Sequence, residues 1–147
     1  MPKPYGIQIC VDTRDAHNLA DWWAESLGWT VEPSDPVFIQ RMIDGGYATE
    51  ADTQTHRGNL VWRGAAAICP PDEVGSPGRR RILFQDVPEE KQTKNRLHYD
   101  VHSGGDDIDA LRDEFLARGA SYVDSHNQGT HRWHVMLDPE GNEFCVS

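Results

Sequence analysis

The stretch IQICVDTRDAHNLADWWAESLG (residues 7–28) decides the fold, because LHYDVHSGGDDIDALRDEFLARG (residues 97–119) follows the same plan. Each stretch starts with alternating apolar residues, continues with apolar residues at helical spacing, and ends at a glycine. A short strand pattern follows each glycine, at Trp29–Val31 and at Ala120–Val123. Such an internal repeat predicts two similar half-domains that face each other across a cleft.

The predicted helices have matching ends in the two copies. Asp15 and Asp106 are the predicted N-caps, and Gly28 and Gly119 are the glycines that end the helices in a left-handed conformation. The same number of residues separates cap and glycine in both copies, which supports a duplication.

Period-two alternation sorts the residues of the two leading strands, Ile7–Asp12 and Leu97–His102, into two faces. The apolar set is predicted to pack under the helices: Ile7, Ile9, Val11, Leu97, Tyr99 and Val101. The other set is predicted to face the cleft: Gln8, Cys10, His98 and Asp100.

The first half carries an additional segment. Asp35-Pro36 opens a predicted helix that Gly45-Gly46 ends, and Thr49–Asp52 adds a turn. Because the second half has no counterpart, residues 35–52 are interpreted as a helical insertion. The remaining strands are predicted as a hairpin at Thr53–Trp62 and as Ala65–Cys69, Arg81–Val87, Trp133–Asp138 and Glu143–Ser147.

Composition restricts the class of protein. The chain has 147 residues, a formal net charge of −10 and a mean hydropathy of −0.67. The negative charge argues against sequence-independent nucleic-acid binding, and no apolar run is long enough for a membrane span. Three widely spaced cysteines and no apolar N-terminal leader favour a reducing, cytoplasmic location.

Three passages resemble the vicinal oxygen chelate superfamily, which includes glyoxalases, bleomycin-resistance proteins and dioxygenases. They are DAHNLADWWAESLG (residues 15–28), NRLHYDV (residues 95–101) and DPEGNEFCV (residues 138–146). The chain looks most like the small stand-alone proteins of the glyoxalase-like branch. This resemblance implies an α+β fold of two βαβββ modules, in which a curved mixed sheet surrounds a cleft and the helices lie outside.

The same resemblance implies one glyoxalase-like domain over residues 1–147. Residues 1–87 would form the first module, residues 88–96 the linker and residues 97–147 the second module. Members of the superfamily commonly pair, so a homodimer is expected.

Metal-binding members of the superfamily place a ligand on each of the two equivalent leading strands, which here implies Gln8 and His98. The family's usual glutamate in the last strand is replaced by Cys145, with Glu143 two residues earlier. Gln85 is the candidate for the remaining ligand. The implied ion is divalent: zinc, nickel, iron or manganese.

Each of these residues also has a structural interpretation. His98 is satisfied by Asp100 or a backbone carbonyl, Gln8 fills the cleft as a polar residue, and Cys145 packs as a small apolar side chain. Both interpretations stay open at this point.

Four further residues are predicted to bind a small molecule: Trp62, Asp100, Trp133 and His134. The two tryptophans would stack against a flat ligand near the mouth of the cleft. His134 is placed by strand alternation on the cleft side, with Met136.

Two functions remain open from the sequence. One is a metal-dependent lyase, isomerase or dioxygenase. The other is a non-enzymatic protein that binds a drug or metabolite, as bleomycin-resistance members do. A purely structural or regulatory protein is the weakest interpretation.

Overall fold

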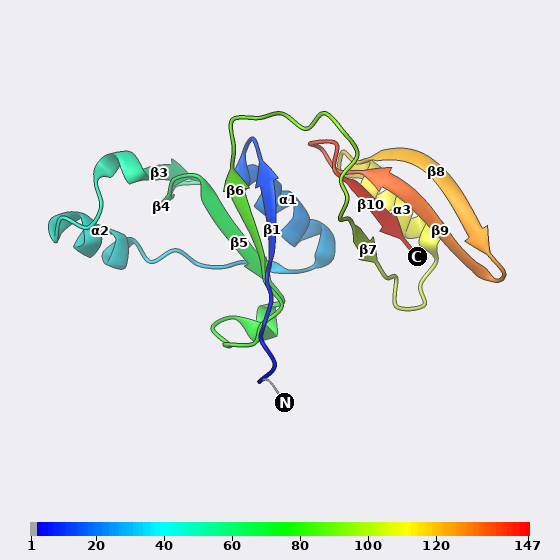
Figure 1. The fold of residues 1–147 in the computed structure, drawn as a ribbon, viewed down its shortest axis with the longest axis horizontal. Helices are drawn as coiled ribbons and strands as arrows, with labels where there is room; N and C mark the ends of the chain where they lie inside the picture. Colours follow the sequence, from blue (N-terminus) through cyan, green and yellow to red (C-terminus); the bar gives the residue numbers. More distant parts are fainter. Residues whose placement is uncertain (1–2) are drawn as a thin grey trace. The chain divides into compact units, whose positions relative to one another are not determined.

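The computed structural model describes residues 3–147, which divide into two compact units bounded at Glu89 and Glu90. Three α-helices and mixed β-sheets confirm the predicted α+β class (Figure 1). Among the described residues, no helix has the length and apolar character needed to cross a membrane.

The first unit contains a four-stranded sheet with one covering helix. Its elements are β1 (Ile9–Thr13), α1 (Ala16–Leu27), β2 (Thr30–Val31), β5 (Ala65–Cys69) and β6 (Ile82–Asp86). The strand order is β1-β6-β5-β2, with β1 parallel to β6 and the other pairs antiparallel.

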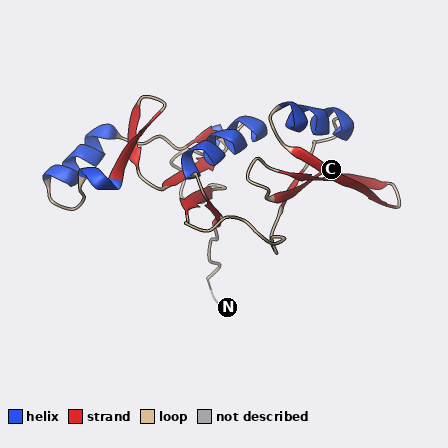
Figure 2. Ribbon diagram, turned by 90° about the horizontal axis from the view of Figure 1, so that it is seen from above, coloured by secondary structure: helices blue, strands red, loops and turns tan. Residues whose placement is uncertain are grey.

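The second unit has the same topology. Its elements are β7 (Tyr99–Val101), α3 (Ile108–Ala117), β8 (Ser121–Gln128), β9 (His131–Leu137) and β10 (Glu143–Val146). The order β7-β10-β9-β8 again has one parallel pair, β7 with β10, followed by two antiparallel pairs. In each unit one helix lies over one face of the sheet (Figure 2), so the predicted repeat is confirmed.

The inserted segment lies between β2 and β5 and is longer than predicted. It comprises α2 (Pro36–Asp44), the 3-10 turn η1 (Glu50–Asp52) and a hairpin of β3 (Thr53–His56) and β4 (Asn59–Trp62). The hairpin forms a two-stranded sheet of its own, apart from the four-stranded sheet. A second 3-10 turn, η2 (Pro71–Glu73), lies between β5 and β6.

Both ends of α1 confirm the prediction, whereas α3 corrects it at the N-terminal end alone. Asp15 caps α1 by accepting from the Asn18 amide, and Gly28 ends it with φ 64°. In the second unit Asp107, not Asp106, is the N-cap. Arg118 is the C-cap, and Gly119 follows it with φ 104°, so a left-handed glycine ends this helix as predicted.

Each unit buries its own apolar core between helix and sheet. The largest fully buried side chains of the first unit include Trp23, Phe84 and Ile68. In the second unit Phe115 of α3 packs against Phe144 of β10, with ring centroids 4.9 Å apart.

The leading strands are shorter than predicted, and three residues predicted to pack under the helices are exposed. Ile7 is 94% exposed and Leu97 is 86% exposed, because both precede the paired part of their strand. Ile9, the first paired residue of β1, is 44% exposed. Burial on this face increases along β1 to Thr13, which is 1% exposed.

Candidate metal and small-molecule sites

Three potential metal ligands meet on the face of the second sheet that lies opposite α3. Asp100 of β7 and Cys145 of β10 are register partners in the parallel pair. His98 lies next to them, with Nδ1 at 3.1 Å from Asp100 Oδ1. One ligand atom from each of the three residues lies within 4.8 Å of the others.

The electrostatics of this group favour a protonated thiol when no ion is bound. Burial raises the pKa of Cys145, and the neighbouring Asp100 carboxylate raises it further. A cation would reverse this effect, because it stabilises both the thiolate and the carboxylate.

The donor set suits some of the divalent ions that the family resemblance implies better than others. Imidazole nitrogen, thiolate sulfur and carboxylate oxygen together are ligands that zinc accepts in proteins. A thiolate is a poor match for manganese, which prefers oxygen-rich sites. The residues present therefore fit a borderline divalent ion such as zinc.

Glu143 lies two residues from Cys145, but its carboxylate is already engaged. Lys91 Nζ donates to Glu143 Oε1 at 2.9 Å, and the Asn95 amide donates to Oε2 at 3.0 Å. Burial alone would raise the pKa of Glu143, but these hydrogen bonds outweigh it and lower the pKa. Glu143 therefore ties the segment before β7 to the sheet.

In the first unit Gln8 is held by an arginine. Arg81 Nη1 donates to Gln8 Oε1 at 2.8 Å, and Arg81 Nε donates to Glu32 Oε2 at 2.9 Å. The amide oxygen expected to bind a metal thus accepts from a guanidinium. A cation at this atom would have to displace Arg81.

The strand registers also change the expected partner of Gln8. Ile9 pairs with Ile82 in the first unit, as Tyr99 pairs with Phe144 in the second. The repeat position of Cys145 is therefore Leu83, and Gln85 lies two residues further along β6. The predicted metal ligand Gln85 is displaced from the repeat position, which holds an apolar residue.

His134 lies on the opposite face from the one predicted. Its register partner is Val146, which is buried under α3 with Phe144 and Met136. His134 is fully buried, with Nε2 at 2.7 Å from Asp109 Oδ1 and Nδ1 at 2.7 Å from Ser125 Oγ. Alternation along β9 predicts the wrong face for His134, because the two faces of this strand do not differ clearly in polarity.

Trp133 lies on the face that carries Cys145. Val135 pairs with Cys145, and Trp133 is two residues from Val135 on the same strand. Its indole contacts His131 and His126, with ring centroids 5.4 and 5.7 Å away. His126 and His131 are thus separated by the sheet from His134, and the three histidines do not form one cluster.

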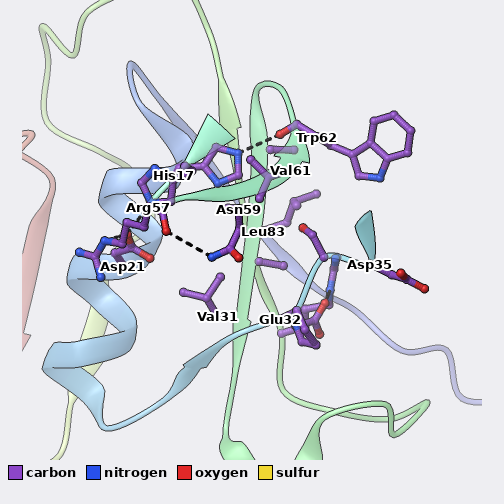
Figure 3. Close-up of a pocket in the computed structure, with 17 residues that line it drawn as sticks. His17, Asp21, Val31, Glu32, Asp35, Arg57, Asn59, Val61, Trp62 and Leu83 are labelled. Carbon is purple, nitrogen blue, oxygen red and sulfur yellow. Dashed lines mark hydrogen bonds and ion pairs between the residues drawn. The ribbon is translucent and has the colours of Figure 1, made fainter. Parts of the chain in front are cut away.

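Trp62 lines a cavity of about 550 Å³ within the first unit (Figure 3). The walls come from α1, the loop after β2, the inserted hairpin and β5. Apolar side chains predominate along β4, β5 and β6: Val61, Trp62, Ala65, Ala66, Ala67 and Leu83. This volume is typical of a small-molecule site.

A polar network forms the wall of the cavity next to α1. His56 Nε2 lies 2.6 Å from Asp21 Oδ2, and Arg57 Nε lies 2.9 Å from the same oxygen. His17 stacks on His56 and donates from Nε2 to the Trp62 carbonyl at 2.8 Å (Figure 3). These contacts attach the inserted hairpin to α1.

This polar network was not predicted from the sequence. His17 and Asp21 lie one helical turn apart on α1, which is a visible signal for a shared polar face. Their partners come from a hairpin whose position no local pattern predicts.

Comparison with known families identifies the chain. The family model described as "Glyoxalase-like domain" matches residues 8–147. The chain belongs to the glyoxalase-like domain family. The match spans both units, the inserted segment and the candidate metal ligands.

Solved structures share the fold of this glyoxalase-like protein at low sequence identity. A glyoxalase family protein from Bacillus cereus has a TM-score of 0.59 at 16% identity, covering 99% of this chain and 94% of its own. The bleomycin-binding protein of Streptomyces verticillus, complexed with copper(II)-bleomycin, has a TM-score of 0.54 at 15% identity, covering 100% and 98%.

The fosfomycin resistance protein FosX from Listeria monocytogenes has a TM-score of 0.60 at 9% identity, covering 99% of this chain and 90% of its own. That structure is a mutant complexed with Mn(II) and 1S,2S-dihydroxypropylphosphonic acid. No curated protein sequence matches the chain significantly.

Proposed function

We propose that this glyoxalase-like protein uses a divalent ion, best matched by zinc, to bind an oxygen-bearing small molecule. His98, Asp100 and Cys145 would hold the ion. The observation that carries the proposal is the convergence of one ligand atom from each within 4.8 Å. The reaction class would be that of a metal-dependent lyase or isomerase. A dioxygenase would require a redox-active ion such as iron at the same ligands, because zinc has no redox chemistry.

The bound ion would act as a Lewis acid toward a substrate oxygen. The chain's own residues prepare the site. The Asp100 carboxylate accepts a hydrogen bond from His98 Nδ1 when that nitrogen is protonated, which orients the ring. Trp133, on the same face, offers an aromatic surface to the organic part of the ligand.

Metal binding by chelator-treated protein tests this proposal. Zinc titration against a chromophoric chelator should show one site, and cobalt(II) should produce a thiolate charge-transfer band. Cys145→Ser should abolish the band, and His98→Ala should weaken zinc binding by about tenfold to hundredfold or more. Cys10→Ser is the matched control, because Cys10 is an exposed thiol of the first unit.

The absence of zinc binding by the folded native chain would contradict the proposal. So would a charge-transfer band that survives Cys145→Ser and disappears in Cys10→Ser.

A second candidate function is sequestration of a drug or metabolite without catalysis. The cavity of about 550 Å³ that Trp62 lines supports it. The ligand would be a small aromatic or amphipathic molecule, and the net charge of −10 favours a cationic one. A panel of such molecules should quench tryptophan fluorescence, with the quenching lost in Trp62→Ala and kept in Trp133→Ala.

The two functions make separable predictions. Quenching that is unaffected by Trp62→Ala would contradict sequestration in this cavity. Quenching that requires zinc and responds to Trp133→Ala would instead support the metal site.

We also propose a homodimer in a reducing, cytoplasmic environment. A reducing environment is supported by the three cysteines, which are free thiols: Cys10, Cys69 and Cys145. Exposed apolar residues before β1 and β7 support association with a second copy.

A further inference from the structure

A serine, a histidine and an aspartate form a linear hydrogen-bonded chain on the α3 side of the second sheet. Ser125 Oγ of β8 lies 2.7 Å from His134 Nδ1 of β9. His134 Nε2 lies 2.7 Å from Asp109 Oδ1 in the first turn of α3. These three groups are on the opposite face from Cys145 and take no part in the proposed metal site.

The charges around Asp109 determine the direction of the hydrogen bonds. The hydrogen bond from Arg132, and then that from His134, lower the pKa of Asp109. Asp109 is therefore ionised at neutral pH and accepts from His134 Nε2–H. A ring that donates from Nε2 and carries no second proton has its lone pair on Nδ1, so Ser125 Oγ–H donates to it. This is the arrangement in which a histidine acts as a general base toward a serine.

Ser125 is partly exposed to solvent, whereas His134, its hydrogen-bond partner, is shielded. His134 is 0% exposed, whereas Ser125 is half-buried on β8, the last strand in the sheet order. Tyr122 Oη lies 2.6 Å from Ser125 Oγ, on the same strand. The Tyr122 hydroxyl is thus the donor next to any carbonyl oxygen that approaches Ser125.

We propose that Ser125 is an activated nucleophile that takes acyl groups from small carboxylic esters. Oγ would form a bond to the carbonyl carbon while its proton passes to His134 Nδ1. The ester C–O bond would then break, and the leaving alcohol would take that proton. Water would later release the acid by the same route, with Asp109 stabilising the protonated imidazole in both steps.

Tyr122 has a distinct part in this activity. Its O–H would turn from Ser125 to the developing oxyanion during attack, as a donor that stabilises the transition state. The activity is independent of the proposed metal site, so a chelator should leave it unchanged.

The experiment uses the full chain treated with a chelator and a nitrophenyl acetate ester as substrate. A burst of nitrophenol should accompany acetylation of Ser125, located by mass spectrometry of peptides. Ser125→Ala should abolish the modification, and Asp109→Asn should slow it by about a hundredfold or more. Ser121→Ala, which removes an exposed serine of the same strand, should react at the native rate.

Two further variants keep the test decisive. Tyr122→Phe should slow the burst and still allow acetylation at Ser125. His134→Gln should prevent acetylation, and its circular dichroism should match the native spectrum. If His134→Gln does not fold, the rates at which a fluorophosphonate probe modifies Ser125 in the native and Asp109→Asn chains provide the test.

A native chain in which Ser125 reacts no faster than Ser121 with either probe would overturn the proposal. Equal rates for the native and Asp109→Asn chains would overturn it as well.

Discussion

Cys145 lies beside Asp100 on the sheet face opposite α3, and its surroundings raise the pKa of the thiol. Burial and the adjacent carboxylate both keep the proton on sulfur, so the pKa lies above its ordinary value. A metal that binds here must release that proton. A thiol ligand at this position would therefore make the proposed metal binding depend on pH.

We predict that zinc affinity rises with pH throughout the range below the raised pKa of Cys145. The metal-free thiol is protonated in that range, and each bound ion displaces its proton. Zinc titrations at several pH values measure how many protons each bound zinc ion displaces, and Cys145→Ser should reduce that number by one. An equal slope in the native and Cys145→Ser chains would show that sulfur is not a ligand.

Gln8 illustrates a different effect of a single neighbour. Its oxygen accepts from Arg81, whose charge repels a cation at the same atom. A cation at this atom would compete with Arg81, and Leu83, the repeat position of Cys145, supplies no ligand.

At the scale of elements, the turn between β9 and β10 depends on one buried aspartate. The Asp138 carboxylate accepts from the Glu140 amide and from the Asn142 amide, both at 2.9 Å. It also accepts from the Asn142 side chain. This turn sets the register between β9 and β10, in which Cys145 pairs with Val135.

We predict that Asp138→Ala lowers the free energy of unfolding by about 2 kcal/mol, because the half-buried amides of Glu140 and Asn142 lose a charged acceptor. Asp138→Asn keeps one acceptor oxygen and should lose roughly half as much. Urea denaturation followed by circular dichroism measures both. An alanine variant as stable as the native chain would contradict this account of the turn.

The hydrogen bonds of Glu143 to Lys91 and Asn95 join β10 to the segment before β7, and they make the stability of the protein sensitive to acid. The lowered pKa of Glu143 means that its contribution to stability is complete above the ordinary carboxyl pKa. That contribution is lost as pH falls through the lowered pKa. Glu143→Gln should therefore be less stable than the native chain at neutral pH, and thermal unfolding curves should converge in acid. A difference in stability between the native and Glu143→Gln chains that stays constant at every pH would contradict this role of Glu143.

At the scale of the whole molecule, two copies of one topology carry different chemistry on equivalent strands. The second unit holds the potential ligands and the serine–histidine–aspartate chain, on opposite faces of one sheet. The first unit holds the inserted segment and the cavity. The two units therefore share a backbone topology but carry different side chains at equivalent positions.

We predict that the protein is a homodimer in which the exposed apolar residues before the leading strands are covered. Ile7→Lys should raise the dimer dissociation constant at least about tenfold, because a buried isoleucine contributes roughly 1.5–3 kcal/mol. Light scattering at a series of concentrations measures this. Tyr47→Lys, at an exposed residue of the inserted segment, should leave the dimer intact. A native chain that stays monomeric at every concentration would contradict the prediction.

Local pattern accounts for the parts of the fold that could be predicted. Caps, helical spacing and the terminating glycines are short-range signals, so α1, the repeat and the hairpin at Arg57-Gly58 were recognisable. The strand ends were not, because Ile7 and Leu97 continue the apolar alternation beyond the residues that pair.

The sequence by itself determined that the chain is a duplicated α+β protein with His98, Asp100 and Cys145 on its second repeat. Only the tertiary structure decided which of these chemical groups meet. Register between β7 and β10 brings Asp100 to Cys145, and packing of α3 brings Asp109 to His134. Such contacts join residues far apart in the chain, and no local periodicity encodes them.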